Sequence, residues 1–174
     1  MEERILVKQA QMGDREAFCK LYGLYKDRYY RYAFYRLQHA ADAEDAVSEC
    51  VLALWKQIPG LREPDAFPVW SYRILSACCA KQIRSQISRR QETDTDDLSV
   101  RGLEELRHED HTDTHLILEE ALSRIGEKER EIVLLSAVSG LTSAQIADIT
   151  GLTPGAVRSS LSRSFKKLRT LLEG

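Results

Sequence analysis

The feature that most constrains the fold of this chain is a short pattern near its C-terminal end. Ala147, Gly151 and Val157 are spaced as A-x3-G-x5-V, with apolar residues at helical intervals around them. A small residue allows two helices to pack closely, and glycine accepts the positive φ at which one helix ends and a tight turn begins. The valine then anchors the following helix on the preceding one. The pattern predicts a helix-turn-helix.

The second helix of this unit is expected to begin at Thr153-Pro154 and to be basic. Threonine is a preferred N-cap, and proline suits the first helical turn, where its missing N–H is not needed. No acidic residue occurs between Pro154 and Leu172, and the charged residues there are Arg158, Arg163, Lys166, Lys167 and Arg169. The major groove of DNA accepts such a helix, and phosphates attract its charge. The alternative is an ordinary helical hairpin with a solvated basic face.

Charge divides the 174-residue chain into three parts. Residues 1–90 carry a net charge of +4, residues 91–112 a net charge of −6, and residues 113–174 are balanced. The middle part is acidic, polar and poor in large apolar side chains, which is typical of a linker. We therefore predict an all-α protein with two small helical domains, 1–90 and 113–174, joined by a flexible linker. Because the net charge of the whole chain is −2, nucleic-acid binding has to come from local basic patches.

The first ninety residues have helical periodicity throughout. Between Phe18 and Leu37, aromatic and apolar residues recur at intervals of three and four, and many of them are tyrosines. Such a stripe suits base stacking, but a buried face with hydroxyl groups at its edge is the more common use of the pattern. A further helix is expected from Asp42 to the break at Pro59-Gly60, and its buried face is expected to consist of Ala46, Val47, Cys50, Val51, Leu54 and Trp55. Its acidic residues gather in the N-terminal half, where the helix dipole favours them.

A third long helix is expected after Pro64-Asp65. From there to Arg90 the segment contains no acidic residue, and Trp70 and Tyr72 stand near its start. Its cations include Arg73, Lys81, Arg84 and Arg89. Aromatic rings that stack on bases, together with cations that bind phosphates, suit single-stranded or distorted DNA. The alternative for Trp70 is a place in the core.

The composition argues against secretion and catalysis. The four cysteines form no CxxC pair, and we interpret them as small apolar residues in a reducing cytosol. The N-terminal segment lacks the pattern of a secretory signal, and no apolar run approaches the length of a membrane span. These features predict a cytoplasmic protein without membrane insertion. Because neither a nucleophile–base arrangement nor a glycine-rich phosphate loop is recognisable, we expect no enzymatic activity and no cofactor.

Taken together, the segments resemble bacterial RNA polymerase sigma factors of the extracytoplasmic-function group of the sigma-70 family. EAFCKLYGLYKDRYYRYAFYRL, followed by DAEDAVSECVLALW, is similar to conserved region 2, with its D-A-E-D helix closed by a tryptophan. FPVWSYRIL is similar to the continuation of that region, which reads the minus-ten promoter element. ALSRIGEKEREIVLLSAVSGLTSAQIADITGLTPGAVRSSLSRSFKKL is similar to conserved region 4, which reads the minus-thirty-five element. The order and separation of the segments match as well.

The resemblance implies an alternative sigma factor that binds core RNA polymerase and promoter DNA, with an anti-sigma protein as a further partner. The residues implied to bind core polymerase are Asp42, Asp45, Val47, Glu49 and Leu54. The residues implied to bind DNA near the minus-ten element are Trp70, Tyr72, Arg73 and Arg84. The residues implied to bind the minus-thirty-five element are Thr153, Gly155, Ala156, Arg158, Ser159, Arg163, Lys166 and Lys167.

The chain also departs from the usual family pattern. Ser48 stands where a glutamine is common in the D-A-E-D helix, and Phe165 stands where a basic residue is frequent. In the third helix, the usual leucine, alanine, asparagine and aspartate are replaced by Ser71, Leu75, Ala77 and Lys81. The recognition helix usually reads G-T-V-K-S-R and here reads G-A-V-R-S-S, so it lacks a hydroxyl and a cation. We expect a divergent member with altered promoter specificity.

Other interpretations stay open on the sequence alone. A helix-turn-helix regulator would bind DNA without acting as a sigma factor, and an interaction module would sequester an anti-sigma protein without binding a promoter. His108, His111 and His115 lie at i, i+3 and i+7. A helix there would place three imidazoles on roughly one face, which suits a transition metal. The alternative for these histidines is a solvated polar linker.

Overall fold

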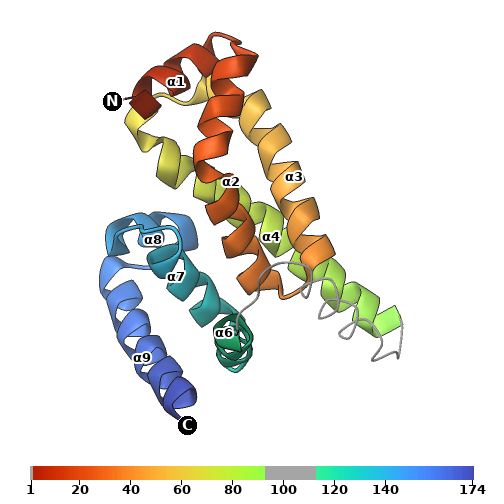
Figure 1. Ribbon diagram of the computed structural model, residues 1–174. Coiled ribbons are helices and arrows are strands. Elements are labelled where there is room, and N and C mark those ends of the chain that lie inside the picture. The colour runs from red at the N-terminus through yellow and green to blue at the C-terminus, as the bar shows by residue number, and fades with distance from the viewer. Residues whose placement is uncertain (1, 93–112) are drawn as a thin grey trace.

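The computed structural model describes residues 2–92 and 113–174, and all regular structure in those ranges is helical (Figure 1). The prediction of an all-α fold is confirmed. The first range contains α1 (Glu2–Gln11), α2 (Arg15–Leu37), α3 (Ala40–Gln57), the 3-10 turns η1 (Ile58–Gly60) and η2 (Pro64–Ala66), and α4 (Phe67–Glu92). The second contains α6 (Asp113–Ser123), α7 (Glu127–Ala137), α8 (Ser143–Thr150) and α9 (Pro154–Glu173). Among these described residues, no helix is long and apolar enough to cross a membrane.

In the N-terminal part, α2, α3 and α4 form a bundle, and α1 packs against α2 and the two 3-10 turns (Figure 1). Asp14 caps α2 by accepting a hydrogen bond from the Ala17 N–H at 3.1 Å. Only Gln38 and His39 separate α2 from α3. Gln38 ends α2 with φ of +55°, and the His39 side chain accepts a hydrogen bond from the first turn of α3. This tight connection places α3 antiparallel to α2.

The core of the N-terminal part is aromatic. Tyr25 and Tyr29 of α2 stack with ring centroids 5.3 Å apart, and Tyr72 of α4 meets Tyr29 edge-on at 5.1 Å. Phe67 closes the cluster 5.4 Å from Tyr25. Because Tyr29 and Tyr72 have no exposed surface, the tyrosine stripe of α2 is a core face rather than a base-stacking surface. Every tyrosine and tryptophan of the chain lies in this part.

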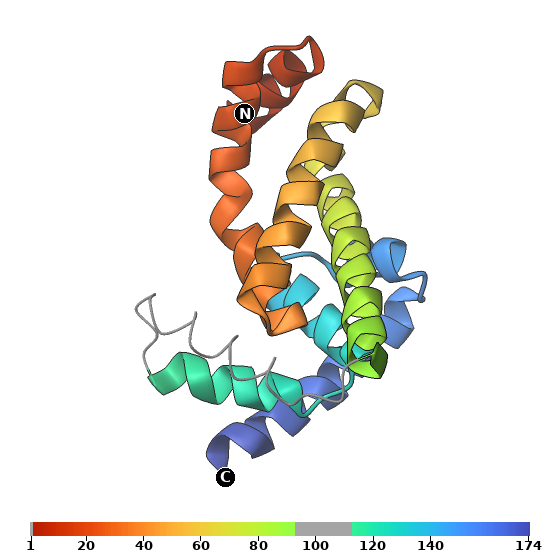
Figure 2. The same ribbon diagram turned by 90° about the vertical axis from the view of Figure 1, so that its right-hand side faces the viewer.

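The C-terminal part has a smaller, aliphatic core. Leu135 of α7, Ile146 of α8 and Val157 of α9 are fully buried there. In Figure 2, α6 lies beside α9, on the side away from α8. The two parts touch, because α2 packs on α7 and α4 packs on α8. The DNA-reading candidates of the two parts are therefore held on neighbouring elements.

The four cysteines are free thiols. Cys50 and Cys79 are buried between the helices of the N-terminal bundle, and Cys19 is exposed. Burial raises the pKa of Cys79 to about 12, so this thiol stays protonated at neutral pH.

Candidate functional site

The turn of the helix-turn-helix is built by three local capping interactions. Gly151 ends α8 with φ of +78° and donates its N–H to the Ala147 carbonyl. Thr142 begins α8 with a capping box, in which its side chain and that of Gln145 each bond the other's backbone N–H. Thr153 caps α9 by accepting the Ala156 N–H at 3.1 Å. These caps fix where each helix begins and ends, and so fix the orientation of α9.

One face of α9 packs inward and the opposite face is open to solvent. The inward side chains are Val157, Ser160, Ser164 and Leu168, all buried. The exposed residues include every one expected to contact DNA in this region: Thr153, Gly155, Ala156, Arg158, Ser159, Arg163, Lys166 and Lys167. Within the described residues, none of the four cations in that set forms an ion pair. Apart from Glu173 at the C-terminal end of the helix, the exposed charged residues of α9 are all cations, and they are available to an anionic ligand.

The acidic helix α3 presents a second candidate surface, which we call the α3 face: Glu44, Asp45, Ser48 and Leu52. These residues are spaced at one, four and eight positions, so they share one side of the helix. Leu52 is 65% exposed. Sequence reasoning missed it, although it lies seven residues after Asp45 and therefore on the same side. A carboxylate and an exposed leucine side by side suit a partner with a basic and an apolar residue.

Three residues expected to bind core polymerase do not reach this surface. Asp42 is 4% exposed, and its carboxylate accepts hydrogen bonds from Arg89 and Gln86 of α4, both at 2.8 Å. Asp42 therefore fastens α3 to α4 instead of facing a partner. Val47 and Leu54 are buried in the core between helices, so the structure does not offer them for apolar contact.

Glu49 lies at the edge of the α3 face and pairs with a cation of α4. Its carboxylate is 3.0 Å from the Lys81 ammonium, and both side chains are largely exposed. Lys81 is one of the residues that depart from the family pattern described in the sequence analysis, so the pair depends on that departure. It links the α3 face to the helix that is expected to read the minus-ten element.

On α4 the expected DNA-binding residues divide into exposed and buried ones. Arg73 and Arg84 are exposed on the surface of the bundle. Trp70 is half-buried, with its ring 5.9 Å from that of Phe67. Tyr72 is fully buried among the rings of α2, so a DNA contact by Tyr72 does not fit this structure. The sequence analysis assigned Tyr72 to DNA binding and kept the core alternative only for Trp70, whereas packing against α2 places Tyr72 in the core.

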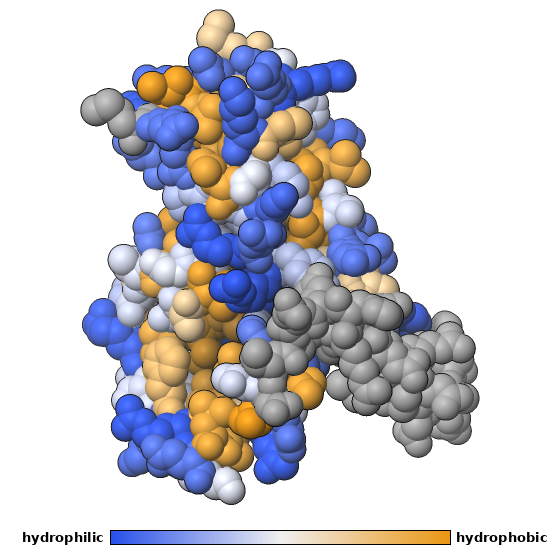
Figure 3. Space-filling model, in the orientation of Figure 1, coloured by the Kyte–Doolittle hydropathy of each residue, from blue (hydrophilic) through white to orange (hydrophobic). Residues whose placement is uncertain are grey.

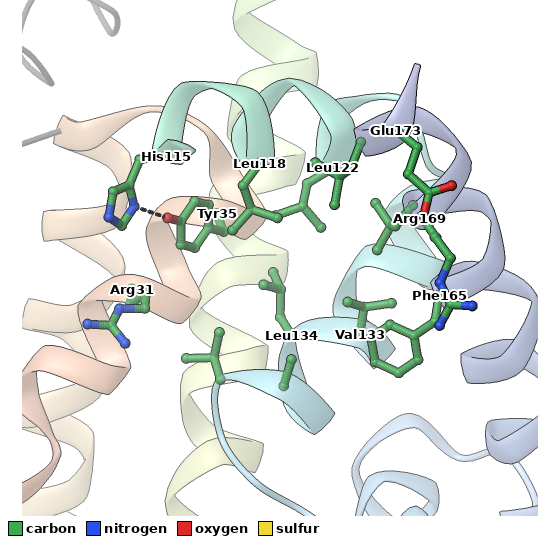
Figure 4. Close-up of a pocket in the computed structure, with 14 residues that line it drawn as sticks. Arg31, Tyr35, His115, Leu118, Leu122, Val133, Leu134, Phe165, Arg169 and Glu173 are labelled. Carbon is green, nitrogen blue, oxygen red and sulfur yellow. Dashed lines mark hydrogen bonds between the residues drawn. The ribbon is translucent and has the colours of Figure 1, made fainter. Parts of the chain in front are cut away.

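The histidine cluster does not come together as a metal site in the described residues. His108 and His111 lie outside those residues. His115 of α6 is hydrogen-bonded through Nδ1 to the Tyr35 hydroxyl of α2 at 2.7 Å (Figure 4). Among the residues that the structure describes, no group of three or more potential metal ligands is found.

An apolar groove of about 780 Å³ lies where α2, α6, α7 and α9 meet (Figure 4). Figure 3 shows apolar side chains gathered on this lower part of the molecule. The apolar lining includes Leu118, Leu122, Val133, Phe165 and Leu172. Arg31 and Arg169 add two exposed cations, and Glu173 adds one exposed carboxylate at the end of α9. Phe165 thus takes part in a groove at the position where a basic residue is common.

Both halves of the chain match known protein families. Residues 21–89 match the family described as sigma-70 region 2, and residues 115–168 match the family described as sigma-70, region 4. The chain is 29% identical over 170 residues to the ECF RNA polymerase sigma factor BldN of Streptomyces coelicolor, covering 96% of this chain and 64% of that protein. It is 28% identical over 148 residues to the RNA polymerase sigma factor SigV of Bacillus subtilis, covering 85% and 86%.

Two solved structures share the fold. CnrH, in complex with the cytosolic domain of CnrY, is similar with a TM-score of 0.72 and 24% identity, covering 99% of this chain and 98% of that one. The sigma factor RpoE from Bartonella quintana, in complex with the anti-sigma factor NepR, is similar with a TM-score of 0.73 and 20% identity, covering 90% and 96%. In both cases the likeness extends over both helical parts.

Proposed function

Because the chain belongs to the sigma-70 family of RNA polymerase sigma factors, and within it to the extracytoplasmic-function group, we propose that it is an alternative sigma factor. It binds core RNA polymerase in the cytoplasm and directs initiation to a restricted set of promoters. The polymerase supplies the chemistry of RNA synthesis, and this chain supplies binding and positioning without a catalytic step of its own.

The observation that carries the proposal is the exposed face of α9. Its caps are complete, and its unpaired cations project from a helix seated on α7 and α8 by Val157 and Leu168. In the major groove, Arg158 and Arg163 would contact base edges, where a bidentate arginine–guanine contact contributes about 1–3 kcal/mol of discrimination. Lys166 and Lys167 would contact phosphates and add affinity without sequence preference.

The α3 face would dock on the polymerase. Asp45 and Glu44 are exposed carboxylates, and Leu52 adds an apolar contact beside them. Glu49, at the edge of the α3 face, would also contact the polymerase. Its carboxylate would then bind a cation of the polymerase in place of Lys81 or together with it. Burial of Leu52 against the polymerase would add affinity, and pairing of the Glu44 and Asp45 carboxylates with basic residues there would fix the orientation of the complex.

The minus-ten element would be bound along α4. Arg73 and Arg84 would hold phosphates, and the half-buried ring of Trp70 would offer an edge to an unstacked base. Lys81 adds a cation at a position that is commonly acidic in the family, and Ala77 lacks the amide of the usual asparagine. These two differences support a promoter preference that departs from that of the relatives.

An anti-sigma protein is the proposed regulatory partner. RpoE from Bartonella quintana, which shares the fold, was solved in complex with the anti-sigma factor NepR, and CnrH was solved in complex with the cytosolic domain of CnrY. The groove between α2, α6, α7 and α9 suits an amphipathic helix with an apolar stripe and acidic flanks, because Arg31 and Arg169 lie against its leucines and Phe165.

The proposal is tested by transcription in vitro with purified core polymerase on fragmented DNA of the source genome, with sequencing of the transcript starts. The expected result is a set of discrete new starts that share an upstream motif. The variant Arg158→Glu/Arg163→Glu should lose those starts while still binding the polymerase. If the wild-type chain does not bind core polymerase, the sigma assignment fails, and retained DNA binding would indicate a helix-turn-helix regulator instead.

A further inference from the structure

The contacts between α3 and α4 fix how the two helices face each other. Both belong to the N-terminal bundle and lie side by side (Figure 2). Near the start of α3, the Asp42 carboxylate accepts hydrogen bonds from Gln86 and Arg89 of α4. Further along α3, the Glu49 carboxylate lies 3.0 Å from the Lys81 ammonium. The helices are therefore antiparallel, and the residue after Glu49 lies opposite the turn of α4 that precedes Lys81.

This register brings two thiols together, Cys50 of α3 and Cys78 of α4. Cys50 has no exposed surface, and Cys78 is half-buried. The two side chains are hydrogen-bonded to each other. A disulfide requires two cysteines that lie close together and point toward each other, and a hydrogen bond between the thiols meets both conditions.

The two thiols differ in chemical character. The hydrogen bond to Cys78, together with burial, raises the pKa of Cys50, so Cys50 stays protonated and is the donor. The same hydrogen bond lowers the pKa of Cys78, and the Lys81 ammonium adds to the lowering, against the effects of burial and of the Glu49 carboxylate. Because the thiolate is the reactive form, Cys78 is the sulfur that an oxidant attacks first.

The other two cysteines are placed differently. Cys19 is exposed on α2. Cys79 is fully buried, and the charges of Arg36 and Glu131 act on it, so it faces α2 and α7. Successive side chains of a helix are about 100° apart, so Cys78 and Cys79 point in different directions despite being neighbours in the chain. Only Cys78 combines partial exposure with a thiol partner on the facing helix.

We infer that Cys78 and Cys50 form an oxidisable dithiol, which reacts with hydroperoxides and closes into a disulfide between α3 and α4. The Cys78 thiolate attacks the peroxide, the O–O bond breaks, and Cys78 becomes a sulfenic acid while hydroxide or alkoxide leaves. Cys50 then attacks the Cys78 sulfur, the S–S bond forms, the S–O bond breaks, and the released hydroxide takes the Cys50 proton as water. Two electrons pass from the two sulfurs to the peroxide. Small thiols reverse the reaction by exchange.

The disulfide would be a covalent clamp inside the bundle. It would link residues 50 and 78, and such a link stabilises a fold chiefly by restricting the unfolded chain. The α3 face contains neither sulfur, so its exposed side chains would stay available to a partner. Oxidation is therefore expected to strengthen the bundle and to leave this surface in place.

The test uses the full chain with Cys19→Ser, which prevents links between copies through the exposed thiol. After reduction and removal of the reductant, the protein is treated with hydrogen peroxide, digested without reduction and analysed by mass spectrometry. The expected product is one linked pair of peptides, containing Cys50 and Cys78, that is two hydrogen atoms lighter than its parts. The midpoint of thermal unfolding should rise by about 10 °C, and dithiothreitol should reverse both changes.

Three further substitutions on the Cys19→Ser background assign the roles. Cys50→Ala should leave a sulfenic acid on Cys78 that dimedone traps, and Cys78→Ser should abolish both the link and the trapping. Cys79→Ala is the matched control and should form the link like its parent. Far-UV circular dichroism checks folding, and Cys50→Ser replaces Cys50→Ala if the alanine variant unfolds.

Two results would overturn the inference. One is a Cys78 that stays reduced while the chain remains folded. The other is a Cys78 that oxidises without bonding to Cys50, whether it pairs with Cys79 or proceeds to the sulfinic acid. Because these measurements require neither polymerase nor promoter, their failure is distinct from failure of the proposed sigma function.

Discussion

The helices α4 and α9 are both long and basic, but they use their charge differently. On α4, Lys81 pairs with Glu49 at 3.0 Å and Arg89 pairs with Asp42 at 2.8 Å, so part of its charge holds α3 in place. On α9, the exposed cations have no such partners among the described residues. The charge of α9 is therefore available to a phosphate backbone, whereas part of the charge of α4 stabilises the N-terminal bundle. The pairing on α4 also makes the proposed polymerase and minus-ten surfaces parts of one rigid body.

The largest effect should come from reversing charge on α9. Arg158→Glu/Arg163→Glu should weaken binding to the promoter duplex at least about 100-fold, because each arginine loses a contact of about 1–3 kcal/mol and gains repulsion from phosphate. Fluorescence anisotropy at fixed salt measures the affinity. Lys128→Glu, an equally exposed cation on α7, is the matched control. A loss below about threefold would mean that α9 does not carry the binding.

A smaller effect, on stability rather than on DNA binding, is expected when the ion pair between Asp42 of α3 and Arg89 of α4 is removed. Asp42→Asn should lower the free energy of unfolding by about 2 kcal/mol, because a buried carboxylate loses its charged hydrogen bond to Arg89. Affinity for DNA should not fall, since Asp42 is buried and the substitution adds no negative charge. Urea unfolding measures the change, and the exposed Asp45→Asn is the control. Equal effects of the two variants would contradict the structural role of Asp42.

The cap of α9 should contribute about 1 kcal/mol. Thr153→Ala removes the side-chain acceptor of the Ala156 N–H and should fray the first turn, where Gly155 and Ala156 are proposed to contact DNA. Thermal unfolding followed by circular dichroism should report the loss, together with a modest drop in promoter affinity. Thr153→Ser keeps the acceptor and should behave like the wild type. If the serine variant loses as much, the hydroxyl cap is not the cause.

The smallest effect is expected for the exposed pair between α3 and α4. A double-mutant cycle with Glu49→Gln and Lys81→Met should give a coupling below about 1 kcal/mol, because both side chains are more than a third exposed and water screens the pair. The coupling should shrink further in high salt. A coupling free energy of several kcal/mol that does not change with salt would contradict this prediction. It would mean that the Glu49–Lys81 pair is shielded from water and stabilises the bundle.

The sequence predicted α9 more accurately than it predicted α3 and α4. Gly151, Thr153 and Val157 act within one short segment, so their spacing alone determines the turn, the cap and the buried face. Burial in the bundle depends on which helices pack together. Tyr72 satisfies the helical pattern equally well on a core face or on a DNA-facing surface, and only the approach of α2 decides between them. For Val47 the periodicity of the helix predicted burial, and the assignment to polymerase contact came from the family resemblance.

The buried Arg36 of α2 and its ion pairs with Glu127 and Glu131 of α7 were not foreseen, although α2 contains a signal for them. Arg36 continues the stripe of Tyr25, Tyr29 and Tyr32 at helical spacing, so a charge stands where the pattern calls for a buried residue. A buried arginine requires carboxylate partners. Its partners lie more than 90 residues further along the chain, and no local pattern identifies which of the many glutamates they are.

The one-sided distribution of aromatic residues has an experimental consequence. Trp55 and Trp70, together with all seven tyrosines, precede residue 73, so intrinsic fluorescence reports on the N-terminal bundle alone. Backbone circular dichroism reports on both parts, because both are helical. Two melting curves recorded on one unlabelled sample therefore separate the parts of the molecule. If the two melting temperatures coincide, the two parts unfold cooperatively. If they differ, the additional transition seen by circular dichroism gives the stability of the C-terminal part, which contains no tryptophan or tyrosine.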